Sequence, residues 1–329
     1  MRNGAYLPAP RPRLPAPLRR TIPDGLAGGG ARPLPGPRRI SRPGIYMMDP
    51  RRYHADPVVR PSLSHSIARI LLDRSPLHAR HAHPRLTPER AGQPPTQAMI
   101  AGSVLHRLIL GRGEEVVVVP GDDYRRGAAR ELRDDAIARG AIPILAPEFG
   151  RLRRCADAVL AQLHDEPEAA SFFAPGRSEA VAIWRVGPVW CRGMIDRLPH
   201  APGLPMWDIK STALSARPED WERTLARRYA TQAAFYRLGA GLALGRPAGE
   251  MRFIVFERDP PHAISLVACG ETLMEAAEAE VKRALRLWAQ ATITGEWPGY
   301  GRGVHRIEAP VHMLLRAEAG TAAPGRLAA

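Results

Sequence analysis

The sequence predicts an α/β domain in which helices flank a central mixed β-sheet. Five segments rich in β-branched and aromatic residues lie between residues 179 and 268 and are predicted to be strands. Segments with helical spacing of apolar residues precede, interrupt and follow these strands. With 45% apolar residues among 329, the chain can bury a substantial core, as one large domain or two small ones.

The first half of the chain is predicted to be mainly helical. Four segments have apolar residues at helical spacing: Ser62–Asp73, Thr96–Leu110, Tyr124–Arg139 and Pro147–His164. Ser62 or Ser64 is a suitable cap for the first helix, and Gly111 ends the second. A short β-branched run, Glu115–Val119, is predicted to be a strand between them.

The second half of the chain contains the predicted sheet. Three strands come close together, with a Gly-Pro turn between the first two: Glu179–Val186, Val189–Leu198 and Pro205–Lys210. A long helix follows over Pro218–Leu244. Two more strands, Met251–Arg258 and His262–Ala268, precede a closing helix over Glu271–Thr294.

Both ends of the chain are predicted to be disordered. Residues 1–43 are dense in Pro, Arg and Gly, and residues 309–329 have a similar character, so neither segment can bury enough apolar surface to fold. The folded domain is therefore expected over residues 44–308. The net charge is +14, of which +9 lies within residues 1–60. This basicity favours a polyanionic partner, although most of the charge lies outside the folded domain.

Composition excludes several classes of protein. The three cysteines, Cys155, Cys191 and Cys269, are far apart, which argues against a zinc ribbon, an iron–sulfur cluster or a disulfide framework. No run approaches the ~18 apolar residues of a membrane span. The first residues also lack the apolar stretch of a secretory signal. We therefore expect a cytoplasmic protein that makes no membrane contact.

A charged pair interrupts the third predicted strand, in the sequence WDIKST. Side chains alternate along a strand, so Asp208 and Lys210 project from one face while Trp207 and Ile209 project from the other, into the core. Burying such a pair costs free energy unless it is paired, binds a metal or lies at an open end of the sheet. The D-x-K motif formed by residues 208–210 is therefore a candidate functional site.

Two further carboxylates are predicted to lie near the D-x-K motif. Asp196 is near the end of the preceding strand, and the loop that follows can bring it back beside Asp208. Glu179 begins the first strand of the group. Three carboxylates and a lysine on adjacent strands form an oxygen-rich site of the kind that Mg²⁺ or Mn²⁺ prefers. Phosphodiester hydrolysis requires such a site, because the cation offsets charge on the phosphate.

The spacing of the D-x-K motif is weak evidence by itself, and the sequence contains its own control. Of 47 basic residues only two are lysines, Lys210 and Lys282, and both follow an acid two residues earlier. Glu280 and Lys282 lie in a segment with helical spacing, where residues two apart face different directions. The Asp208 copy is distinguished by its strand and by the residues around it.

The helix after the D-x-K strand presents polar side chains on one face. Gln232 and Tyr236 are four residues apart, and Tyr229 is three residues before Gln232. In an ordinary helix these tyrosines would pack with their hydroxyls exposed. Alternatively, amide and phenol donors lie beside the metal and contact DNA phosphate or a metal ligand.

These residues together resemble the PD-(D/E)xK nuclease superfamily. Asp196, the D-x-K motif and Gln232-Ala-Ala-Phe-Tyr236 are similar to the RecB-type branch, which carries a QxxxY motif. The resemblance is strongest to the nuclease domain of the exodeoxyribonuclease VIII type and covers roughly residues 43–300. Local matches include Gly44–Tyr46, Tyr53–Asp56, Ser75-Pro76, Gly102–His106, Cys191-Arg192 and Asp208–Thr212. It implies a restriction-endonuclease-like core.

The resemblance also implies roles for individual residues. Asp196, Asp208 and the Ile209 carbonyl would bind the metal, with Glu179 and His106 as further ligands, and Lys210 would be the catalytic lysine. Gln232 and Tyr236 would be the QxxxY pair on the DNA side, together with Tyr229, Arg228 and Arg192. Two positions depart from the common pattern: Ile195 stands where Pro is frequent, and Asp208 stands where Glu is commoner.

The activity implied by the resemblance is a metal-dependent exonuclease on double-stranded DNA. It would hydrolyse one strand from an end, 5′→3′, as a ring-shaped homo-oligomer that works with a single-strand annealing protein in phage-type recombination or DNA repair. Three alternatives stay open: an endonuclease or single-strand nuclease of the same fold, a DNA-binding protein with an inactive site, and an unrelated α/β metalloenzyme. The set Asp196, Asp208 and Lys210 argues against the inactive protein, and the QxxxY pair argues against the unrelated enzyme.

Overall fold

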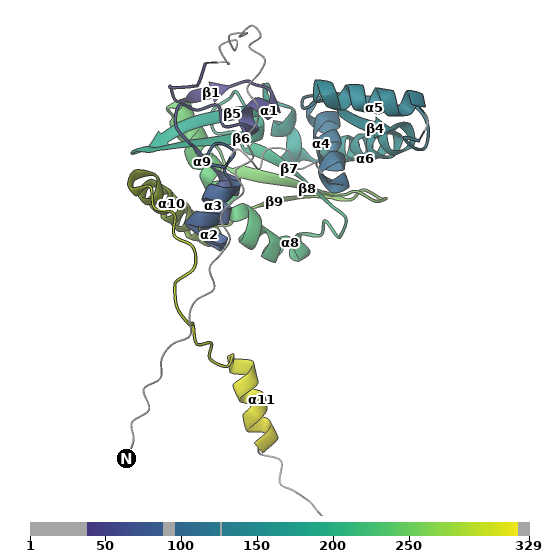
Figure 1. Cartoon of the computed structure of the whole chain (residues 1–329). Coiled ribbons are helices and arrows are strands. Elements are labelled where there is room, and N and C mark those ends of the chain that lie inside the picture. Colours follow the sequence, from purple (N-terminus) through teal and green to yellow (C-terminus); the bar gives the residue numbers. More distant parts are fainter. Residues whose placement is uncertain (1–37, 88–95, 126, 322–329) are drawn as a thin grey trace, which may run out of the picture. The chain divides into compact units, whose positions relative to one another are not determined.

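A seven-stranded mixed β-sheet forms the centre of the computed structural model, which describes residues 38–87, 96–125 and 127–321. The chain divides into two units between Arg38 and Arg39, and the sheet and its helices belong to the second. Six strands lie in the order β1-β5-β6-β7-β8-β9 (Figure 1). Their bounds are β1 Gly44–Tyr46, β5 Gly176–Val186, β6 Val189–Pro199, β7 Met206–Thr212, β8 Met251–Glu257 and β9 Ile264–Ala268. The seventh strand, β2 Leu63–Ser64, pairs with β6.

Connections explain which strand pairs are antiparallel. β5 and β6 form a long hairpin, and β6–β7 and β8–β9 are also antiparallel. β7 and β8 are parallel, because a helical crossover carries the chain from one end of the sheet back to the other. The crossover consists of α8 Pro218–Thr224, a π-helical turn over Leu225–Tyr229 and α9 Ala230–Leu244. The mixed sheet predicted from the sequence is confirmed.

Helices pack against both faces of the sheet. One core cluster combines apolar residues of the crossover with those of α2 His65–Asp73 and α10 Glu271–Thr294. A second cluster, which contains Trp207 and Ile209 of β7, packs against α4 Gln97–Leu110 and α6 Ala146–Asp165. A third covers the β1–β5 side with residues around α1 Pro50–His54. Trp207 and Ile209 lie on the face of β7 opposite to that of Asp208 and Lys210, as the predicted alternation requires.

Smaller elements complete the described part of the chain. β3 Val116–Val119 and β4 Ile142–Leu145 form a separate two-stranded parallel sheet, joined by α5 Gly127–Arg139. β4 was not predicted, because Pro143 interrupts a run of only four residues. Three short helices are α3 Pro76–Ala82, a 3₁₀ turn over Pro167–Ala169 and α7 Ala170–Phe173.

The ends of the chain differ in part from the prediction. Residues 1–37 lie outside the described part of the structure, so the predicted disorder there is not addressed. Within the C-terminal segment predicted to be disordered, residues Val311–Thr321 form α11. Val311, Leu314 and Leu315 recur at helical spacing, a signal that outweighs the Gly and Ala content of this segment.

Two strands share one edge of β6 and leave a gap between them. β5 pairs with the opposite edge of β6 over nearly its whole length. On the other edge, β2 pairs with Cys191 and Arg192, whereas β7 pairs only at Arg197, opposite Trp207. Residues 193–196 of β6 therefore lie at a fork, where β7 diverges and backbone groups need other partners.

The β5–β6 hairpin is distorted at the same point. Glu179 and Asp196 are opposite each other, yet they are missing from an otherwise continuous ladder. Glu179 has φ 52°, a left-handed conformation that is costly for a residue with a side chain. The alternation of β6 also breaks here, because Ile195 and Leu198, three residues apart, pack in the same core cluster. This break turns both acids toward the fork.

Candidate active site

The D-x-K motif lies on the face of β7 that is turned toward the crossover helix. Asp208 is 2% exposed, and the Lys210 side chain is 18% exposed. The Lys210 ammonium forms an ion pair with Asp208 Oδ1, although their geometry is not that of a hydrogen bond. The predicted outward face is therefore a largely buried one, with Lys210 at its more open end.

Asp196 closes the fork between β6 and β7. Its Oδ2 accepts a hydrogen bond from the Ile209 backbone N–H at 2.8 Å, in place of a carbonyl from a neighbouring strand. This bond fixes the Asp196 carboxylate beside the D-x-K motif, as the sequence predicted. The side chain thus takes part in the sheet as well as in the candidate site.

His106 of α4 reaches the same point from the other side. Its Nε2 lies 3.1 Å from the Ile209 carbonyl oxygen, so the tautomer protonated at Nε2 donates a hydrogen bond to it. Its Nδ1 lies 3.6 Å from Asp196 Oδ2. Two predicted metal ligands, His106 and the Ile209 carbonyl, are therefore bonded to each other in this structure.

Glu179 completes a group of three acids. Its strained backbone directs the carboxylate toward Asp196, and its Oε2 is buried without a hydrogen-bond partner. Burial raises the pKa of Glu179, and the charge of Asp196 raises it further. Burial also raises the pKa of Asp208, to about 6, again with help from Asp196 and against the attraction of Lys210. The group therefore carries more buried negative charge than its single lysine neutralises.

The donor set suits a hard cation. The buried Glu179 Oε2 has no hydrogen-bond partner and Asp208 Oδ1 contacts only the Lys210 ammonium, and oxygen ligands are those that Mg²⁺ and Mn²⁺ prefer. Within the described ranges, no three His, Cys, Asp or Glu side chains are already gathered as a metal-binding group. Small side-chain movements would be needed, because Asp208 contacts Lys210.

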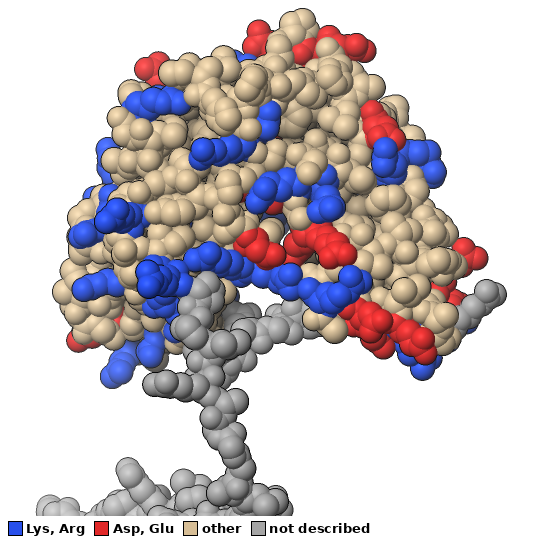
Figure 2. Space-filling view, turned by 90° about the horizontal axis from the view of Figure 1, so that it is seen from above, with Lys and Arg blue, Asp and Glu red and all other residues tan. Residues whose placement is uncertain are grey.

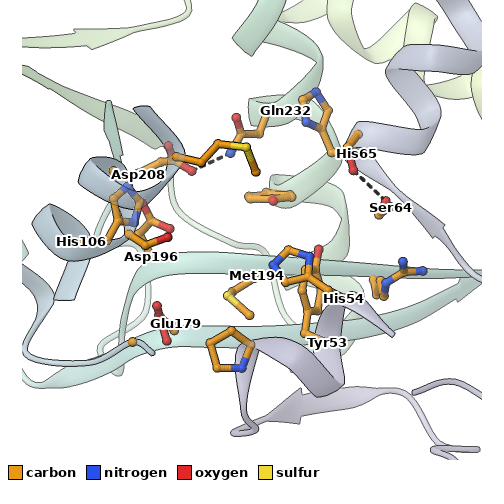
Figure 3. A pocket seen from close by; sticks show the side chains of 18 of the residues that line it. Tyr53, His54, Ser64, His65, His106, Glu179, Met194, Asp196, Asp208 and Gln232 are labelled. Atoms are coloured by element: carbon orange, nitrogen blue, oxygen red, sulfur yellow. Dashed lines mark hydrogen bonds and ion pairs between the residues drawn. The ribbon is translucent and has the colours of Figure 1, made fainter. Parts of the chain in front are cut away.

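A cleft of about 640 Å³ opens over these residues. In Figure 3, Asp196, Asp208 and His106 lie together at one end with Glu179 nearby, while Tyr53, His54 and Met194 lie beside them across β6. Ser64 and His65, at the N-terminus of α2, form part of another wall. Residues from nine elements, α1, β2, α2, α3, α4, β5, β6, β7 and α9, therefore meet at one cavity.

The QxxxY pair enters the cleft from α9. Gln232 Nε2 donates to Asp208 Oδ2 at 2.5 Å, and Gln232 is 6% exposed. The Tyr236 ring packs against Gly193 in the gap of β6, where a Cβ would come within 2.9 Å of the ring. Burial raises the pKa of Tyr236 well above its ordinary value. Both residues reach the site as predicted, where Gln232 holds the acid of the D-x-K motif and Tyr236 fills the fork.

The other three residues predicted to contact DNA lie in different surroundings. Tyr229 follows the π-helical turn, and its ring lies against Lys210, so it faces the D-x-K motif as Gln232 does. Arg192 is 3% exposed; its guanidinium donates to the Ser62 carbonyl at 2.6 Å and lies 3.3 Å from Asp56. Arg192 lines the cleft, but its charge is paired with buried groups. An arginine in a sequence does not show whether it is paired in this way. Arg228 is exposed on the crossover helix and does not line the cleft.

Comparison with known proteins shows the family of the chain. A family model described as a PDDEXK-like domain of unknown function (DUF3799) matches residues 75–309. The chain belongs to this family. No curated protein matches it. A crystal structure of a candidate exonuclease from Eubacterium rectale is similar over 78% of this chain and 93% of that one, with a TM-score of 0.45 and 12% identity.

The PDDEXK-like domain also contains polar residues that the sequence alone did not identify as part of the site. His65 Nε2 lies 3.3 Å from Thr231 Oγ1, and its ring meets the Tyr236 ring edge-on at 6.3 Å. Burial, together with the charges of Lys210 and Arg69, lowers the pKa of His65 to about 3, so it is neutral near pH 7. No local pattern marks this residue, because its partners are far away in the sequence.

Proposed function

We propose that this PDDEXK-like domain is a nuclease that hydrolyses phosphodiester bonds of DNA with a divalent cation, Mg²⁺ or Mn²⁺. The observation that carries the proposal is the meeting of Glu179, Asp196 and Asp208 with Lys210 in one cleft. Each residue comes from a sheet strand, and each acid is at least nine-tenths buried. So much buried negative charge is costly without a cation, and a site of this kind serves phosphate chemistry.

The cation would be held by Asp196, Asp208 and Glu179. The Ile209 carbonyl and His106 lie beside them: when His106 donates from Nε2 to the Ile209 carbonyl, its Nδ1 and the second lone pair of the carbonyl oxygen are left for a cation. When bound, a divalent cation would offset the negative charge that develops on the scissile phosphate. The acids are fixed in place by other residues: Ile209 N–H holds Asp196, and Gln232 holds Asp208.

Lys210 would act on the phosphate itself. Burial lowers the pKa of this lysine, but attraction by Asp208 and Asp196 outweighs that effect, so the pKa is raised and the ammonium is charged. From the open end of the cleft, its N–H groups would donate to phosphate oxygens and stabilise the charge of the transition state. Gln232 keeps Asp208 from turning toward the lysine with both oxygens.

The surface around the cleft suits a polyanionic partner. Lys and Arg side chains surround acidic ones near the middle of the face in Figure 2, an arrangement that attracts a polyanion while leaving a place for a cation.

The remaining features of the proposal rest on resemblance to exodeoxyribonuclease VIII-type nucleases. We infer 5′→3′ degradation of one strand of duplex DNA, a ring-shaped homo-oligomer, and a single-strand annealing protein as partner in recombination or repair. None of the described helices is long and apolar enough to cross a membrane.

The test compares linear with closed circular duplex DNA in the presence of Mg²⁺, with each strand end labelled separately. We expect loss of the linear DNA from its 5′ ends and no cutting of circles. Asp208→Ala and Lys210→Ala should bind DNA but degrade it at least about 100-fold more slowly. Lys282→Ala is the matched control, because that lysine is exposed on α10, and it should behave as wild type.

Each other result has a definite meaning. Cutting of closed circles would overturn the exonuclease mode and favour an endonuclease. Binding without any loss of either DNA would overturn nuclease activity and leave a DNA-binding protein. Equal activity of Lys210→Ala and wild type would show that the site is elsewhere.

A further inference from the structure

The crossover helix makes one wide turn opposite Lys210. Over Leu225–Tyr229 the helix is of the π type, and the Ala230 N–H bonds to the Leu225 carbonyl, five residues back. Such turns are rare and often occur at functional sites, because they move one side chain out of the regular helical pattern. Here the displaced side chain is that of Tyr229, whose φ of −118° departs from helical values.

The wide turn places the Tyr229 ring beneath the lysine. Lys210 Nζ lies 4.7 Å from the centre of the ring, within the range of a cation–π interaction. On its other side Lys210 contacts Asp208. The ammonium is therefore held between a carboxylate and the face of an aromatic ring.

The Tyr229 ring is itself held by two buried aromatic residues. Trp221 stacks on it at 5.8 Å with an angle of 13°, and Phe253 of β8 lies 5.8 Å away. Trp221 is fixed in turn, because its indole N–H donates to the Ser215 carbonyl at 3.1 Å. Exposure is 6% for Trp221 and none for Phe253, so neither ring can easily turn away.

We propose that Tyr229 is a positioning residue for Lys210. A lysine side chain has a flexible four-carbon stem, and a contact with Asp208 alone would leave the ammonium free to swing toward or away from the cleft. The aromatic seat formed by Tyr229, Trp221 and Phe253 removes that freedom and keeps the charge aimed at the phosphate. The inference rests on the proposed nuclease function for its catalytic meaning, but the contact between ring and lysine can be tested alone.

The contact between the Tyr229 ring and Lys210 can be measured directly, because the chain contains only two lysines. In full-length protein labelled with ¹³C-lysine, the ring current of Tyr229 should shift the Lys210 side-chain signals upfield of those of Lys282, which is exposed. Tyr229→Leu should move the Lys210 signals toward the position of Lys282. Tyr229→Phe, which keeps the ring and lacks only the hydroxyl, should leave them shifted. An unchanged far-ultraviolet circular dichroism spectrum of each variant shows that the fold is intact, and Lys282→Arg assigns the two signals.

Kinetics then test the positioning role. Tyr229→Leu should lower kcat by about tenfold with little change in KM, because the lysine acts on the transition state more than on the bound strand. Tyr229→Phe should restore the wild-type rate. A Lys210 signal that is the same in wild type and Tyr229→Leu, or equal kcat for Leu and Phe variants, would overturn the proposal. A shifted Lys210 signal in a wild-type protein without nuclease activity would support the seat and overturn the proposed function, so the two failures are told apart.

Discussion

Asp56 is the residue whose loss should destabilise the wall of the cleft most. Its carboxylate is fully buried and accepts hydrogen bonds from Ser62, from the hydroxyl at 2.6 Å and the backbone N–H at 3.0 Å. It also lies 3.3 Å from Arg192 and 3.4 Å from both His83 and Arg85. This one carboxylate therefore connects three parts of the chain: the N-terminal segment that contains Ser62, the residues that follow α3, and strand β6.

The expected cost follows from what the substitution leaves behind. In Asp56→Ala, the 4% exposed guanidinium of Arg192 keeps its charge but loses its carboxylate, and Ser62 loses two hydrogen bonds. Breaking a buried ion pair by removing one partner costs about 3–5 kcal/mol of unfolding free energy. Asp56 also has φ 58°, which Asn tolerates well, so Asp56→Asn should cost less, about 2–3 kcal/mol. Asp157→Ala is the control, since its pair with Arg153 is exposed and worth no more than about 0.5 kcal/mol.

Urea unfolding of the three variants measures these differences through the midpoint, provided that the slope m stays the same. Although burial raises the pKa of Asp56, its bonds to His83, Arg192 and Ser62 lower it more, so the net pKa is lowered. Its stabilisation is therefore present above the ordinary pKa of an aspartate and is lost as pH falls through the lowered pKa of the folded state. The difference in unfolding free energy between wild type and Asp56→Asn should therefore become smaller at acid pH. An Asp56→Ala protein within about 1 kcal/mol of the Asp157→Ala control would refute the argument.

Three further substitutions test other parts of the structure. Because burial and nearby positive charge lower the pKa of His65 to about 3, the unfolded chain takes up a proton below pH ~6.5 that the folded protein refuses. Wild type should thus lose about 1 kcal/mol more than His65→Gln between pH 7.5 and 5.5, measured by urea unfolding at each pH. Gln232→Ala leaves the acid of the D-x-K motif without its donor, and kcat should fall about tenfold with DNA binding retained in a filter assay. In α9, Gly239→Ala would place a Cβ 2.6 Å from the Trp184 indole and should cost about 1–3 kcal/mol, whereas Gly241→Ala meets nothing closer than 3.5 Å and should not destabilise.

The sequence predicted those features that depend on local periodicity. Alternation along β7 was enough to separate Asp208 from Trp207, and helical spacing placed Gln232 and Tyr236 on one face of α9. Asp196 was also found, because a short loop can only return the chain beside the strand it has just left. These inferences need no contact between distant parts of the sequence.

Features that depend on long-range contacts could not be predicted. The π-helical turn has no signal in the sequence, so the contact between the Tyr229 ring and Lys210 was not predicted. Arg192 was interpreted as a DNA contact because its carboxylate partner is 136 residues earlier in the chain. The left-handed backbone of Glu179 is imposed by the hairpin at the fork, and a glutamate gives no local reason to expect it.

The fork in the sheet explains why the candidate site is where it is. Where β7 leaves β6, the backbone of Ile209 would lack a partner, and a side-chain carboxylate supplies one. Any acceptor could satisfy that N–H, so hydrogen bonding alone does not explain why two more acids are buried next to it, one of which, Glu179, has an oxygen without a partner. Buried charge of one sign persists only when something balances it, and Lys210 balances one carboxylate of the three. The strained Glu179 backbone is a further cost at the same point. The divalent cation that we propose would offset these costs together, because it would satisfy the Glu179 oxygen and the excess charge at once.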